Sequence, residues 1–402
     1  MAIASRSTHS RRLTFDGATL EQAVHRCLEL ANPLGVIRLM KSTTPERRQF
    51  VLDVDDDRNH RLVWTFRALE NGTELSISIQ DPLSRLLGIA RRPTLNDREL
   101  ERTLGLLPQV MNMKVVVLGG GTGLYTTLLA LQGRAPFLSA VISGLPRAGR
   151  RRDPKDQMGA LPLEDAGLCL VALTPTLREN LVLRALLEHR MRSGDCFGAN
   201  FGTLLLQALS EMRGSEQGGL DDAAHVLHIA GRIILAAEMG EADVVEGPNA
   251  AALAAIREAD MLVIAPGHFD LDTMPVFASP GIAVAFERAR ALKVVITTVM
   301  TAENQPGQAT TSQQLETLRR MVPGPVDVVL ANDPIFAEGQ LRAYAHLGAR
   351  PVIPDLDATA RFARRVVVEQ ITAPGDLARH DPARLGDQLM ATGAAALLAR
   401  GR

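Results

Sequence analysis

The sequence predicts an α/β fold, a Rossmann-like, doubly wound, mostly parallel sheet preceded by a small α+β domain. Three observations predict it. The 402 residues are too many for one small core, which favours two domains. After residue 113, short and almost continuously apolar segments alternate with segments of helical spacing, as in sheets that are buried on both faces. Before residue 113, strand-like segments follow one another directly.

The first domain is expected to span residues 1–112. A helix is predicted over 18–31, followed by β segments over 47–57, 60–72 and 73–80, and by a closing helix over 97–111. Asn71-Gly72 has the composition of a hairpin turn. This order is similar to that of helix-grip, ligand-cradling domains, and the role of the domain stays open.

The second domain is expected to span residues 113–402 and to hold the parallel sheet. Its strands are predicted over 114–119, 137–143, 261–267, 293–300 and 326–333. Its helices are predicted over 177–191, 202–212, 251–260, 281–292 and 311–322.

Composition limits the classes of partner. A net charge of -1 and an aromatic content of 3% argue against a nucleic-acid partner. No apolar run approaches the roughly 18 residues of a membrane span, so no membrane partner is expected. Three widely spaced cysteines, Cys27, Cys169 and Cys196, predict reduced thiols and a cytoplasmic location. The Ser- and Arg-rich start reads as a tail rather than a signal or transit peptide. A homo-oligomer is an open alternative to a monomer.

The end of the first predicted parallel strand carries a glycine-rich loop before a helix. Ligands of open parallel sheets bind at this edge, and a helix start offers N–H donors and a positive dipole end to a phosphate. The loop therefore predicts a nucleotide or nucleotide-sugar ligand, and the alternative is a tight turn without a ligand. The candidate residues are Gly119, Gly120, Gly121, Thr122 and Gly123.

A second strand end, over 263–275, adds another candidate. Pro266 and Gly267 end the strand, and His268 follows them directly. Asp270 and Asp272 come next, and with the imidazole they could ligate a divalent ion such as magnesium. The alternative is a capped, solvated loop.

Two further loops have ligand-binding features. The basic segment 144–167 could clamp phosphates through Arg147, Arg150, Arg151, Arg152 and Lys155, or could be a solvated charge run. A third glycine-bearing helix start offers another close approach of backbone to ligand, at Gly198, Asn200 and Gly202.

The motifs together, in their order, resemble the CofD/YvcK-like family of 2-phospho-L-lactate transferases and gluconeogenesis factors. They are VVVLGGGTGL, GALPLEDAGLCLVAL, FGANFGTLLLQAL, DVVEGPN, ADMLVIAPG with MPVFASPGIAVAFERA, and VMTAENQPGQ. The resemblance covers roughly residues 113–335. It implies a Rossmann-like domain that binds a nucleotide or nucleotide-sugar. One branch of the family transfers a phospholactyl group from a guanosine-linked donor to a deazaflavin with magnesium. The other binds UDP-sugars and regulates carbon metabolism and cell-envelope synthesis without established catalysis.

The sequence also departs from the family pattern. Pro146, Arg147, Ala148 and Gly149 stand where the family has Asp-Asp-Gly-Gly. The family's Gly-His-Ser-x-Gly-Asn is replaced over 198–203, and its Gly-Ser-Leu-Tyr-Thr over 267–271. The lost aspartates put metal-assisted transfer in doubt, while Arg147 and Gly149 become candidates for direct contact with a diphosphate.

These features support a first hypothesis and two rivals. The first is a nucleotide- or UDP-sugar-binding regulatory protein that resembles the gluconeogenesis factor. One rival is an enzyme that transfers a phosphoryl-linked group from a nucleotide donor, with Asp270 and Asp272 replacing the lost acidic pair. The other rival is a scaffold without catalysis.

Overall fold

The computed structural model describes residues 10–16, 36–44, 47–53, 61–70, 72–80, 112–143, 163–174, 182, 185–187, 189–239, 245–301, 308–322, 324–345, 348–375 and 377–400. The chain divides into two compact units, one of Met1–Asn112 with Ala394–Arg402 and one of Met113–Gly393. Each unit is described by itself.

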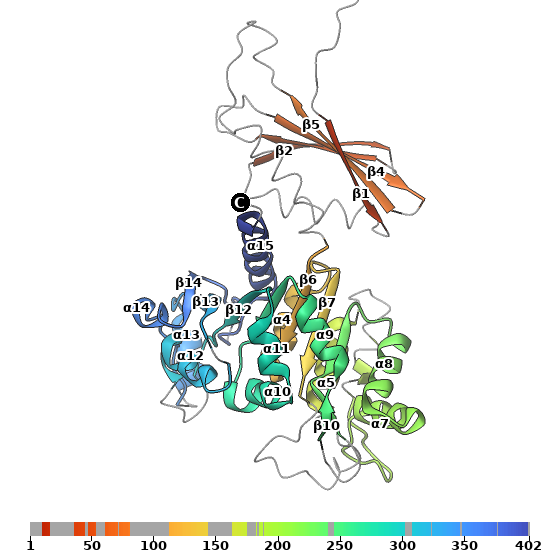
Figure 1. Ribbon diagram of the computed structural model, residues 1–402, viewed down its shortest axis with the longest axis vertical. Coiled ribbons are helices and arrows are strands. Elements are labelled where there is room, and N and C mark those ends of the chain that lie inside the picture. The colour runs from red at the N-terminus through yellow and green to blue at the C-terminus, as the bar shows by residue number, and fades with distance from the viewer. Residues whose placement is uncertain are drawn as a thin grey trace, which may run out of the picture. The chain divides into compact units, whose positions relative to one another are not determined.

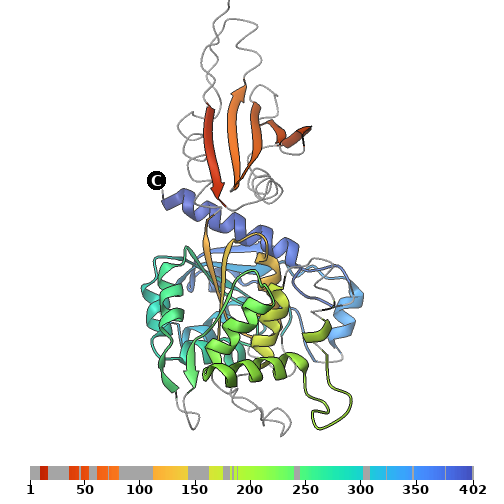
Figure 2. The ribbon, with the colours of Figure 1, turned by 90° about the vertical axis from the view of Figure 1, so that its right-hand side faces the viewer.

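The first unit contains a five-stranded antiparallel sheet (Figure 2). Its strands are β1 (Ser10–Asp16), β2 (Val36–Thr44), β3 (Arg47–Asp53), β4 (Arg61–Leu69) and β5 (Gly72–Gln80). The order β1-β5-β4-β3-β2 places the first strand beside the last, and the other four form a meander. Leu69 pairs directly with Gly72, so the hairpin turn precedes Gly72, one residue earlier than expected. The helices expected over 18–31 and 97–111 lie outside the described residues.

The second unit is built on a seven-stranded parallel sheet (Figure 1), which confirms the predicted fold class. Its strands are β6 (Lys114–Leu118), β7 (Phe137–Ile142), β8 (Arg232–Leu235), β11 (Met261–Ile264), β12 (Leu292–Ile296), β13 (Val326–Asn332) and β14 (Ala363–Glu369). A separate antiparallel pair consists of β9 (Ala237–Met239) and β10 (Val245–Pro248).

The strand order β14-β13-β12-β11-β6-β7-β8 contains a topological switch point. The chain runs from β6 outward to β8, returns to place β11 beside β6, and continues outward to β14. The carboxyl ends of β6 and β11 therefore lie side by side where the winding direction reverses. In open α/β sheets this is the crevice where ligands bind.

Helices connect the strands and cover the sheet. They are α4 (Gly121–Leu131), α5 (Leu163–Leu173), α7 (Phe201–Arg213), α8 (Glu216–Val226), α9 (Ala250–Glu258), the π-helical turn η3 (Phe269–Thr273), α10 (Met274–Ala278), α11 (Ile282–Arg288), α12 (Thr311–Arg319), α13 (Glu338–Ala345), α14 (Leu356–Thr359) and α15 (Pro382–Arg400). Val116 and Leu118 of β6 share one buried cluster with residues of α9, α11 and α12. Because side chains alternate along a strand, Val115 and Val117 point to the opposite face.

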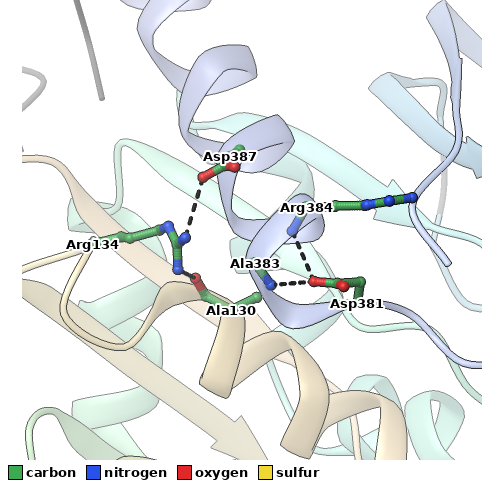
Figure 3. A network of polar contacts seen from close by, with 6 residues as sticks. All are labelled: Ala130, Arg134, Asp381, Ala383, Arg384 and Asp387. Atoms are coloured by element: carbon green, nitrogen blue, oxygen red, sulfur yellow. Dashed lines mark hydrogen bonds and ion pairs between the residues drawn. The ribbon is translucent and has the colours of Figure 1, made fainter. Parts of the chain in front are cut away.

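Helix α15 packs against α4 and passes the starts of two strands. Its Gly386 lies so close to α4 that a Cβ there would be 2.3 Å from the carbonyl oxygen of Ala130. A Cβ on Gly393 would be 2.8 Å from the sulfur of Met113, the residue before β6. Arg134, just beyond α4, donates to the Ala130 carbonyl at 3.1 Å and pairs with Asp387 of α15 at 3.2 Å (Figure 3). No helix among the described residues is long and apolar enough to cross a membrane.

Candidate functional site

The switch point brings together two of the predicted loops. A Cβ built on Gly123 would lie 1.5 Å from the carbonyl oxygen of Pro266, and one on Gly119 would lie 3.1 Å from the Cβ of Ala265. The glycine loop after β6 and the loop after β11 are therefore packed backbone to backbone. The strand pairing of β6 with β11 fixes this contact.

The glycines of the β6–α4 loop serve different purposes. Gly119 and Gly121 have φ values of 143° and 65°, which side-chain-bearing residues rarely adopt. Gly123 has no such φ but is required by the Pro266 contact. Gly120 precedes the helix with φ -158°, an extended conformation open to any residue. Backbone conformation therefore requires glycine at two of these four positions and packing requires it at a third.

The first N–H of helix α4 already has an acceptor. Asp165, near the start of α5, accepts a hydrogen bond from the backbone N–H of Gly121 at 2.8 Å. Asp165 is only 3% exposed. Helix geometry leaves the N–H groups of Thr122 and Gly123 without intrahelical acceptors. Thr122 is exposed on the same turn. The helix start thus combines a buried carboxylate with remaining donors.

A second carboxylate borders the same loop from η3, the turn that follows the neighbouring strand β11. Asp272 accepts a hydrogen bond from the backbone N–H of His268 at 3.0 Å. Its carboxylate lies 3.2 Å from the position that a Cβ on Gly121 would take and 2.9 Å from that of Gly267. Asp272 belongs to η3, whose Phe269 is fully buried in the core. The buried ring anchors the turn, and the turn directs Asp272 toward the glycine loop.

Thr273, the last residue of η3, adds a buried hydroxyl. The residue is 1% exposed, and its Oγ1 has no hydrogen-bond partner in the described part of the chain. This oxygen lies 3.8 Å from the position of a Cβ on Gly119. A buried, unsatisfied hydroxyl is costly, which makes it a candidate contact for a ligand or an ordered water.

Cys169 lies one helical turn after Asp165 and is fully buried. Burial raises the pKa of its thiol well above the usual value, and the charge of Asp165 raises it further. The residue therefore stays a neutral thiol, and it is a packing residue behind Asp165 rather than a nucleophile.

The other predicted residues have local roles or lie outside the described residues. Gly198 has φ 83° and accepts a hydrogen bond from Arg190, while Asn200 caps α7 by accepting from the Thr203 N–H at 3.2 Å. Gly202 is buried against the carbonyl oxygen of Leu187. All of these contacts join residues within 187–203. Arg147 and Gly149, with Arg150, Arg151, Arg152 and Lys155, lie outside the described residues.

The expected metal ligands have unlike surroundings. Asp270 is exposed, whereas Asp272 is half-buried and bonded to His268. Within the described ranges, no group of three or more His, Cys, Asp or Glu side chains gathers as a metal cage would require. The structure instead brings both Asp165 and Asp272 next to Gly121. Magnesium is commonly held by one or two carboxylates together with water and substrate phosphates, so this oxygen donor pair fits it.

Asp165 is the site residue that sequence reasoning missed. It lies 44 residues from Gly121, and nothing in the loop itself points to it. The available signal was an acidic residue next to a strongly apolar helical run, LEDAGLCLVAL, because a carboxylate buried there needs a partner.

Comparisons with known proteins agree on this second unit. The family model described as 2-phospho-L-lactate transferase CofD matches residues 115–246 and 238–372. A putative gluconeogenesis factor of Aquifex aeolicus is 28% identical over 317 residues, 69% of this chain and 96% of the relative. The gluconeogenesis factor of Bacillus subtilis is 27% identical over 310 residues, 69% of this chain and 97% of the relative.

A solved structure is similar as well. The crystal structure of a UPF0052 family member from Bacillus halodurans superposes with a TM-score of 0.61 at 25% identity, covering 69% of this chain and 99% of that one. Residues 1–112 lie outside the match to the family model, which begins at residue 115.

Proposed function

Because the chain belongs to the CofD family of 2-phospho-L-lactate transferases, we propose that its β6–α4 loop binds a nucleotide or nucleotide-sugar through the diphosphate. The observation that carries this proposal is the position of the loop at the switch point between β6 and β11. The free donors at the start of α4, the exposed Thr122 and the buried Thr273 hydroxyl give a phosphate several partners at one place.

We further propose a regulatory protein that resembles the gluconeogenesis factors, the description that its relatives carry. A UDP-sugar is the ligand we favour, with a link to carbon metabolism or cell-envelope synthesis. Other cell components would recognise the ligand-bound protein, and the protein would not convert the ligand.

A second candidate function, phosphoryl-linked group transfer, draws support from one specific observation. Asp165 and Asp272 both border Gly121, so acidic groups are present at the loop although the family's Asp-Asp-Gly-Gly is replaced in the sequence. These two residues would hold a magnesium ion, which would neutralise the charge of a bound diphosphate. The residues of the chain itself would bind and orient the phosphates.

The binding test uses a variant that the fold tolerates. Thr122→Glu places a negative charge in the first turn of α4, where the helix dipole favours it, but next to the proposed phosphate position. Thr122→Gln has nearly the same shape without the charge. We expect UDP-sugars or GDP, with magnesium present, to raise the melting temperature of the parent and of Thr122→Gln but not of Thr122→Glu. Equal stabilisation of all three proteins would show that the loop is not a phosphate site.

Turnover separates the two functions. We expect no transfer product when the parent is incubated with magnesium, a guanosine-linked phospholactyl donor and a deazaflavin acceptor. Formation of the transferred product, detected by mass spectrometry, would establish the enzyme and reject the regulator.

A further inference from the structure

The protein's own carboxylates occupy the anion positions of the proposed cradle. Asp165 accepts the N–H of Gly121 at 2.8 Å, and Asp272 accepts the N–H of His268 at 3.0 Å. Both donors are backbone groups at the edge of the switch-point loops, the kind that bind phosphate in other folds. A phosphate that entered the cradle would therefore find these two donors already engaged by negative charge, beside the remaining donors at the start of α4.

Asp272 is the better placed of the two to oppose a phosphate. Its carboxylate lies within 3.3 Å of the Cβ position of Gly121 and 2.9 Å of that of Gly267, so it fills the space between the two loops. Asp165 approaches from α5 and is buried, whereas Asp272 is half-buried. Glycine at 121 and 267 leaves room for this carboxylate.

A separate observation points to a ligand at the same place. The Oγ1 of Thr273 is buried without a hydrogen-bond partner among the described residues, and it faces the Gly119 end of the loop. A buried hydroxyl without a partner is costly, so a bound ligand or an ordered water is expected to form a hydrogen bond with it. The carboxylate and the hydroxyl are neighbours in η3, so the turn presents one repelling and one attracting group to the loop.

We propose that Asp272 is a specificity-determining residue that excludes a free diphosphate from the cradle and admits one accompanied by a divalent cation. The inference rests on the proposed function, because it concerns the same site. A like charge at contact distance in a partly buried site weakens binding by roughly tenfold or more, and a cation between carboxylate and phosphate reverses the sign of the interaction.

Asp272→Asn tests the inference. The amide oxygen can still accept the His268 N–H, so the turn keeps its hydrogen bond while the charge is removed. Asp357→Asn on α14 is the matched control, because it removes the same charge from an exposed position outside the site. Calorimetric titrations of full-length proteins use inorganic pyrophosphate and GDP as probes, once in EDTA and once in magnesium. Melting temperatures check that each variant is folded.

In EDTA we expect Asp272→Asn to bind pyrophosphate and GDP about tenfold or more tightly than the parent and Asp357→Asn. Magnesium should tighten the binding of both probes by the parent. It should tighten their binding by Asp272→Asn about tenfold less than it does for the parent. If the parent binds GDP and Asp272→Asn shows no gain in EDTA, the inference is wrong and the proposed function stands. If neither protein binds pyrophosphate or GDP with or without magnesium, the inference is wrong, and the proposed function is then decided by the UDP-sugar arm of the melting-temperature test.

Discussion

Gly123 of α4 and Pro266 after β11 are packed so closely that a Cβ on the glycine would lie 1.5 Å from the proline's carbonyl oxygen. No rotamer change relieves such an overlap, because the backbone fixes the position of a Cβ and the proline oxygen belongs to the backbone. The two loops of the candidate site are thus held at a fixed separation by a glycine whose φ is ordinary.

The Gly123–Pro266 contact predicts a large effect of one methyl group. Gly123→Ala should lower the free energy of unfolding by about 2–4 kcal/mol, because the loops must separate to admit it. Gly167→Ala is the control: Gly167 is also helical, but a Cβ there meets nothing within 4 Å, so the change should be neutral or stabilising. Urea denaturation measures both, and equal stability of the two variants would contradict the close contact.

Part of this architecture was predictable from the sequence. The strands β6, β7, β11, β12 and β13 were predicted because runs such as Val115–Val117 are apolar almost without interruption, as burial on both faces demands. Strand β14 was missed because it lies at the edge of the sheet, where Arg364 and Arg365 are exposed and break the apolar pattern. Strand β8, which begins with the exposed Arg232, was missed as well.

The candidate site was less predictable, for physical reasons. The loops after β6 and β11 were identified because the end of an apolar strand can be recognised from the local sequence. Their contact depends on strand order, which no local pattern encodes. The three consecutive glycines were interpreted as a sign of a ligand, but Gly119 and Gly121 are explained by positive φ alone. Gly120 differs from both, because its extended φ of -158° is open to any residue and its conformation alone does not explain a glycine.

A buried histidine predicts how stability depends on pH. Burial lowers the pKa of His380 from 6.5 to about 4, and a hydrogen bond to the backbone of Thr297 opposes that shift. The unfolded chain therefore takes up the proton first as the pH falls. The contribution of neutral His380 is complete above pH 6.5 and lost toward pH 4, by up to about 3 kcal/mol.

His380→Gln removes this titration. Between pH 7 and pH 5 the variant should lose less stability than the parent, whatever its stability at pH 7, whereas His228→Gln, at an exposed position, should follow the parent. Denaturation midpoints at several pH values measure the slopes. Parallel slopes for parent and His380→Gln would mean that His380 titrates normally in the fold.

The contact between α15 and α4 allows the contributions of packing and of charge to stability to be compared. Gly386→Ala should cost about 1–3 kcal/mol, because its Cβ would lie 2.3 Å from the Ala130 carbonyl and 3.0 Å from the Arg134 side chain. Asp387→Asn should cost less than about 1 kcal/mol, since that carboxylate is 63% exposed in its pair with Arg134. Gly339→Ala in α13, with nothing within 4 Å, is the control. A larger loss for Asp387→Asn than for Gly386→Ala would reverse this ranking.

The two described cysteines should differ in reactivity. The raised pKa and full burial of Cys169 keep its thiol neutral and covered, while Cys196 is partly exposed. Iodoacetamide at mildly alkaline pH should modify Cys196 in the native protein and modify Cys169 only after denaturation. Peptide mass spectrometry after a time course measures both, and modification of Cys169 at the rate of Cys196 would show that α5 opens readily.

The pairing of β6 with β11 also has a consequence for biosynthesis. Lys114 and Asp260, which are hydrogen-bonded where these strands begin, are 146 residues apart in the chain. At a translation rate of about 5–20 residues per second, β6 leaves the ribosome roughly 7–30 s before its central neighbour exists. Strand β7 can pair with one edge of β6 early, but the other edge stays open throughout this interval. The nascent chain thus carries an exposed apolar strand edge until β11 is made, and this interval is when it most needs a chaperone.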